Sequence, residues 1–121
     1  MRQRWPSRLW IVRHGQSAGN VARDLASAAG EHMIDIPMRD VDVPLSDLGG
    51  SQADAVGRWF AGFPEEERPE IVLASPYARA RETANRICAA GGTAPDAKGP
   101  VIDERLRERE FGILDRMTTE A

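Results

Sequence analysis

Apolar residues lie along the chain either in short unbroken runs or at the spacing of a helix face. Residues 9–12 (LWIV) and 70–74 (EIVLA) are short runs rich in β-forming residues. Such runs are typical of strands buried in a parallel sheet. Residues 101–102 (VI) indicate a third, shorter strand.

Two segments between these runs carry the signals of amphipathic helices. The first has Val21 and Leu25 on one face and Gly30 as its stop. The second begins at Ser46, a residue suited to cap a helix, and ends at Gly62. Its expected inner face comprises Leu48, Ala53, Val56 and Phe60.

A third helix is predicted in SPYARARETANRICAA, directly after the second strand. Ser75 is expected as its cap and Pro76 as its first residue, because proline suits the first helical position. Gly91 and Gly92 are expected to end it. Its expected buried stripe comprises Ala80, Ala84, Ile87 and Cys88. The segment 31–44, which contains two prolines, is expected to be irregular.

The order of strands and helices favours an α/β fold with a parallel sheet. Ligands of such sheets bind beyond the carboxyl ends of the strands. Arg13 and His14 follow the first predicted strand, and Arg79 falls in the first turn of the helix after the second. Two guanidinium forks and the N–H groups of helix starts would suit an anion. From the residues alone, a structural His14 and a solvated Arg79 remain open alternatives.

The composition indicates one globular domain: of 121 residues, 41% are hydrophobic and 29% charged. No apolar run reaches the ~20 residues of a membrane span. A net charge of −3 argues against a nucleic-acid partner. Because Cys88 is the only cysteine, no internal disulfide can form and a cytoplasmic setting is expected. With one cysteine and only two histidines, His14 and His32, no metal site is expected.

Aromatic residues and arginines refine this picture. Lys98 is the only lysine, so positive charge is carried by planar, forked guanidinium groups that suit carboxylate or phosphate. The large aromatic side chains are expected to pack in the core or at its edges, with Tyr77 the best candidate to line a pocket mouth. These residues are Trp5, Trp10, Trp59 and Tyr77.

Four motifs occur in order along the chain: RHGQSAGN, DVPLSDLGGSQADAVG, SPYARARETA and LREREFG. Together they resemble the signatures of the histidine phosphatase superfamily, the phosphoglycerate mutase-like proteins. The family pattern has an Arg-His-Gly turn, then a Pro-Leu-Ser/Thr element leading to a Gln-Ala helix. Ser-Pro-x-x-Arg-Ala and Leu-x-Glu-Arg-x-x-Gly follow. The resemblance implies a three-layer α/β sandwich around a parallel sheet, with no cofactor.

The resemblance also implies catalytic roles. His14 would be the nucleophile that becomes phosphorylated, and Glu108 would protonate the leaving oxygen. Within the charged run that carries Glu108, Glu104 and Glu110 are rivals that only geometry can exclude. A self-paired, solvated charge cluster is the other interpretation of this run.

The remaining motif positions would bind the phosphoryl group. Arg13 and Arg79 would grip its oxygens, and Asn20 and Ser17 would add hydrogen bonds. Gly15 would let the backbone approach the phosphate, although a lone glycine also suits a simple tight turn. Two arginines neutralise the ester and hold it in line, while a neutral imidazole attacks phosphorus and splits hydrolysis into two easier steps.

One family element has no counterpart in this chain. The second catalytic histidine of the family lies in a His-Gly element downstream of the acid, and neither His14 nor His32 matches it. We therefore expect residues 1–121 to be the N-terminal part of the domain, apparently truncated. Its sheet would keep an exposed edge that could pair with a second copy.

Two classes of function follow. The first is an enzyme acting on a small phosphorylated metabolite, and phosphatase is preferred over mutase because EREFG departs from the Glu-Arg-His-Tyr-Gly form of the mutases. The second is a non-catalytic module that binds phosphate or another chain. Formation of phosphohistidine separates the two, since only the enzyme predicts it.

Overall fold

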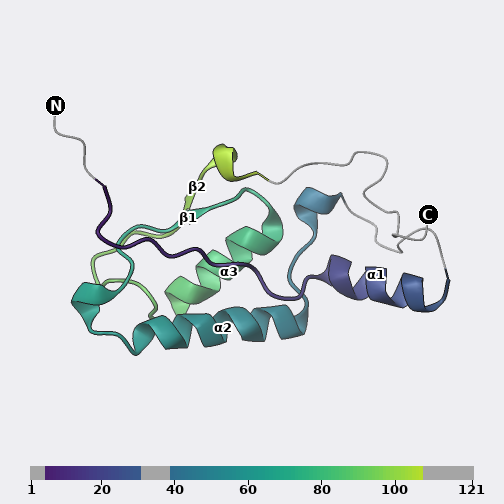
Figure 1. The fold of residues 1–121 in the computed structure, drawn as a ribbon, viewed down its shortest axis with the longest axis horizontal. Coiled ribbons are helices and arrows are strands. Elements are labelled where there is room, and N and C mark those ends of the chain that lie inside the picture. The colour runs from purple at the N-terminus through teal and green to yellow at the C-terminus, as the bar shows by residue number, and fades with distance from the viewer. Residues whose placement is uncertain (1–4, 31–38, 108–121) are drawn as a thin grey trace.

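The computed structural model describes residues 5–30 and 39–107, which form a mixed arrangement of helices and strands (Figure 1). The helices are α1 (Ala18–Ala28), α2 (Asp47–Ala61) and α3 (Ala78–Ala89), and the strands are β1 (Leu73–Ala74) and β2 (Val101–Ile102). Short 3₁₀ turns are η1 (Asp40–Asp42), η2 (Glu65–Glu67) and η3 (Glu104–Leu106). Within these residues, no helix combines the length and the apolar character needed to cross a membrane.

β1 and β2 form a parallel ladder, so the predicted mixed fold with a parallel sheet is confirmed. Leu73 pairs with Val101 and Ala74 with Ile102. The predicted strand at 70–74 is too long, because only its last two residues pair with β2. It is also less buried than expected: Ala74 is buried, whereas Leu73 is 54% exposed. The three-layer sandwich stays a prediction.

The predicted strand at residues 9–12 does not form in the described part of the chain. The segment runs as an extended trace past the sheet (Figure 1), and Ile11 is 91% exposed. A strand requires a hydrogen-bonded neighbour, and no ladder to a described residue includes this segment. The apolar run therefore predicted extended backbone but not pairing or burial.

Helices α2 and α3 lie side by side beneath the sheet (Figure 1). The bounds of α2 confirm the prediction, with Ser46 as its cap and Gly62 at its end. Its buried face comprises Gly49, Gly50, Ala53, Gly57 and Phe60. The prediction was thus right for Ala53 and Phe60 and wrong for Leu48, which is exposed.

Glycine determines which face of α2 is buried. A Cβ atom on Gly57 would lie only 2.7 Å from the Cβ of Ala90, just beyond the end of α3. The helices approach more closely here than an alanine would allow. Small residues thus form the contact between α2 and the end of α3, although the hydrophobic spacing along α2 predicted larger residues on its buried face.

Helix α3 begins at Ala78, two residues later than predicted. The Ser75 hydroxyl accepts a hydrogen bond from the Tyr77 N–H at 3.2 Å, and Tyr77 keeps an extended backbone. This local turn competes with helix formation, so Ser75 does not cap the helix itself. The residues buried on α3 are Arg79, Thr83, Ala84 and Ile87, whereas Ala80 and Cys88 are half-buried.

The aromatic side chains include a buried tyrosine and a cluster of rings that packs around the buried Phe60. Tyr77 is fully buried, so it does not line a pocket mouth. Trp10 stacks edge-on against Phe60, with ring centroids 5.1 Å apart, and fastens the extended N-terminal segment to α2. Trp5 was predicted to pack but is 77% exposed.

Candidate functional site

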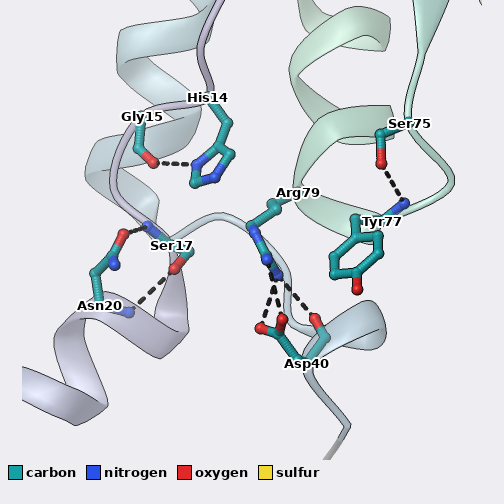
Figure 2. A network of polar contacts seen from close by, with 8 residues as sticks. All are labelled: His14, Gly15, Ser17, Asn20, Asp40, Ser75, Tyr77 and Arg79. Carbon is teal, nitrogen blue, oxygen red and sulfur yellow. Dashed lines mark hydrogen bonds and ion pairs between the residues drawn. The ribbon is translucent and has the colours of Figure 1, made fainter. Parts of the chain in front are cut away.

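The loop before α1 presents the predicted nucleophile. His14 is half-buried, and its Nδ1 lies 2.7 Å from the carbonyl oxygen of Gly15 (Figure 2). A carbonyl oxygen can only accept, so Nδ1 must carry the proton of this hydrogen bond. In the neutral ring the lone pair then resides on Nε2, which makes Nε2 the nucleophilic atom.

Ser17 and Asn20 hold each other at the start of α1. The Ser17 hydroxyl accepts from the Asn20 N–H at 3.0 Å, and Asn20 Oδ1 accepts from the Ser17 N–H at 2.9 Å (Figure 2). This reciprocal capping box fixes the first turn of α1. The first turn directly follows residues 13–16, which we call the His14 loop. Both residues were predicted to bind phosphate, and that role stays a prediction.

The His14 loop is clamped against the start of α2. Gln52 Oε1 accepts from the Gln16 N–H at 2.9 Å, and the Ser46 N–H donates to the Gln16 carbonyl at 3.0 Å. A side chain at Gly15 would overlap the Gln52 amide. Gly15 therefore admits a helix side chain close to the loop, and it needs no positive φ to do so.

Arg79 is the buried cation of the region. It lies in the first turn of α3, as predicted, with its side chain 7% exposed. Nη1 donates to the Asp40 carbonyl at 2.8 Å, and Nη2 lies 3.3 Å from Asp40 Oδ2 (Figure 2). The guanidinium carbon also lies 4.8 Å from the centroid of the Tyr77 ring. Stacking on a buried ring and binding to a carbonyl hold this charge in a fixed place.

One segment, residues 39–46, joins the two halves of the region. Asp40 contacts Arg79, and the Leu45 N–H donates to Glu82 Oε1 on α3 at 3.3 Å. The same segment bridges to the loop before α1, where Ser17 and Leu45 form an isolated antiparallel bridge. The His14 loop and the first turns of α3 are thus anchored to a common element.

The remaining predicted site residues are a second phosphate-binding arginine and the candidate proton donors. Arg13 is exposed on the extended segment. Glu108 and its rival Glu110 lie outside the described residues. The rival Glu104 pairs with Arg107 at 3.1 Å and is largely exposed.

Two further side chains can be assessed as chemical groups. A hydrogen bond from the Arg105 side chain lowers the pKa of Asp103 to about 2, so this carboxylate is ionised near neutral pH and cannot serve as a proton donor there. Burial raises the pKa of the Cys88 thiol above its ordinary 9.0. The thiol is therefore a poor nucleophile near neutral pH, because reactivity needs the thiolate.

Metal-ligating residues do not gather in the described ranges. Across residues 5–30 and 39–107, no group of three or more histidine, cysteine, aspartate or glutamate side chains is placed to hold a metal ion.

Sequence reasoning missed two residues that shape the region. Asp40 was assigned to an irregular segment, and no local motif indicates that it would reach a residue 39 positions away. Gln52 was noted only as part of the second motif. It follows Gly49 by three residues, so the two lie on the same side of α2, but nothing in the sequence indicates that this side faces the loop that carries His14.

Comparison with known proteins adds to this geometry. The family model of the histidine phosphatase superfamily (branch 1) matches residues 9–121. Among curated relatives, fructose-2,6-bisphosphatase TIGAR of Xenopus tropicalis is 36% identical over 86% of this chain and 32% of its own length. Fructose-2,6-bisphosphatase TIGAR B of Danio rerio is 32% identical over 88% of the chain and 35% of its own length.

A plant relative also matches. Phosphoglycerate mutase-like protein AT74H of Arabidopsis thaliana is 28% identical over 88% of the chain and 37% of its own length. The chain spans about a third of the length of the curated relatives it matches.

Proposed function

Because the chain belongs to branch 1 of the histidine phosphatase superfamily, we propose that it transfers a phosphoryl group from a small phosphomonoester to His14. The observation that carries the proposal is the hydrogen bond between His14 Nδ1 and the Gly15 carbonyl. That bond orients the imidazole and assigns its lone pair to Nε2, the atom that must attack phosphorus.

In the first step, the Nε2 lone pair forms a bond to phosphorus while the ester P–O bond breaks. The electron pair of that bond leaves with the alkoxide oxygen, which must take up a proton. Glu108 is the proposed donor, on the basis of its place in the motif LREREFG. In the second step, water attacks phosphorus and gives up a proton to the Glu108 carboxylate that the first step left, while the P–N bond breaks and its electron pair returns to Nε2.

Positive charge must surround the phosphoryl group during both steps. Arg79 supplies a buried guanidinium, and Arg13, adjacent to His14, supplies a second. Asn20 and Ser17 lie at the first turn of α1, whose N-terminal end favours negative charge. Since phosphoryl transfer depends mainly on positioning and charge neutralisation, these groups supply the main catalytic requirement.

The proposed substrate is a small phosphorylated metabolite. Relatives from Xenopus tropicalis and Danio rerio are named as fructose-2,6-bisphosphatases, which favours hydrolysis of a sugar phosphate ester. The plant relative is named as mutase-like, so mutase-type transfer is the alternative. Both share the phosphohistidine step.

The experiment is detection of phosphohistidine after incubation with the small phosphodonor acetyl phosphate. We expect an acid-labile phosphate on His14, located by mass spectrometry under alkaline conditions, and none in His14→Ala. His32→Ala is the matched control, because it removes the other histidine, and it should keep the modification. A wild-type chain that stays unmodified, or a His14→Ala variant that is still modified, would contradict the proposal.

A further inference from the structure

The guanidinium of Arg79 already holds an anion, and that anion belongs to the protein. Nη1 of Arg79 lies 3.1 Å from Asp40 Oδ1, and Nη2 lies 3.3 Å from Oδ2. Both terminal nitrogens of the fork therefore face the two oxygens of one carboxylate (Figure 2). A phosphoryl group bound by the same fork would present two oxygens in the same way.

The two partners differ in how firmly they are held. The side chain of Arg79 is 7% exposed, and it is fixed by the Tyr77 ring and by the Asp40 carbonyl. The Asp40 side chain is 29% exposed, and it belongs to the short turn η1. The carboxylate can therefore rotate into solvent while the guanidinium stays in place.

Resting on the proposed function, we propose that the Asp40 carboxylate competes with the phosphoryl group for Arg79 and so sets the affinity of the site. A doubly negative ester that reaches Arg79 must displace this carboxylate, because two anions cannot share the fork without repulsion. The ion pair thus makes phosphate binding weaker than the buried cation alone would allow.

The geometry separates competition from positioning. The Asp40 main-chain carbonyl accepts from Nη1 at 2.8 Å, and substitution of the side chain leaves this bond intact. If the carboxylate only competes, its removal strengthens phosphate binding. If it instead orients Arg79, its removal weakens binding.

The test is titration calorimetry of the chain with inorganic phosphate. For Asp40→Ala and Asp40→Asn we expect a Kd lower by about three- to tenfold, the range for loss of one partly buried ion pair. In the double variant Asp40→Ala/Arg79→Gln, this decrease in Kd should be absent. Should Asp40→Ala fail to fold by near-ultraviolet circular dichroism, Asp40→Asn carries the comparison, because it keeps the side-chain size.

Asp42→Ala is the matched control. It removes the same charge from the same turn, and the contacts of Arg79 described above do not involve it. Its Kd should stay within about twofold of wild type, as expected of a screened surface charge. The competition would be overturned if the Kd of Asp42→Ala for phosphate falls by the same factor, or if the Kd of Asp40→Ala is unchanged or higher than that of the wild type.

Failure of this proposal and failure of the proposed function give different results. Phosphohistidine on wild-type His14 without any gain in Asp40→Ala overturns only the competition. A gain in Asp40→Ala without phosphohistidine overturns only the enzyme and leaves a phosphate-binding site. Absence of phosphohistidine on wild-type His14, together with phosphate binding by none of these proteins, overturns both.

Discussion

At the scale of single residues, the region around His14 depends on close approaches that only small side chains permit. Gly49, in the first turn of α2, lies directly against the Gln16 backbone, two residues after His14. A methyl group there would overlap the Gln16 carbonyl oxygen, which belongs to the main chain and cannot rotate away. This glycine therefore determines how closely α2 approaches the His14 loop.

Replacement of Gly49 by alanine should destabilise the fold and displace the loop. We expect a loss of about 2 kcal/mol in the free energy of unfolding, the usual cost of overpacking. Urea denaturation of the purified variant measures it. Gly99→Ala is the control, because no atom lies within 4 Å of the added carbon, and it should be neutral or slightly stabilising. Equal stability of the two variants would contradict the close approach.

At the scale of elements, the ends of α2 followed local signals, whereas the predicted strand at residues 9–12 did not form in the described part of the chain. Ser46 and Gly62 mark the ends of α2 by hydrogen bonds to near neighbours, so the sequence could predict them. Gly91 and Gly92 end α3 in the same local way, by bonds from their N–H groups to Cys88 and Ile87. A strand instead depends on a distant partner, which explains why the segment 9–12 was predicted as a strand and lacks a described ladder.

The capping box of α1 yields a prediction at this scale. Ser17→Ala removes the acceptor for the Asn20 N–H in a buried position, and we expect a loss of about 1–2 kcal/mol. Thermal unfolding followed by circular dichroism measures the change. Ser27→Ala, within the same helix, should be neutral or slightly stabilising, since alanine has the higher helix propensity. A neutral Ser17→Ala would show that the box contributes nothing to α1.

At the scale of the whole molecule, one segment unites the candidate site. Residues 39–46 contact the His14 loop on one side and α3 on the other, through Leu45 and Asp40. The motifs predicted that His14 and Arg79 belong to one site, but they could not predict this connection, because it depends on contacts between distant positions. The pairing of Asp40 with Arg79 likewise became apparent only in three dimensions.

We propose that the loop before α1 presents Nε2 of His14 to phosphorus. The most direct test is nuclear magnetic resonance of the chain labelled with ¹⁵N-histidine and phosphorylated by acetyl phosphate. We predict phosphorus coupled to Nε2, with Nδ1 still protonated and bonded to the Gly15 carbonyl. Coupling to Nδ1, or a ring that never acquires phosphorus, would contradict the assignment of Nε2 as the nucleophile.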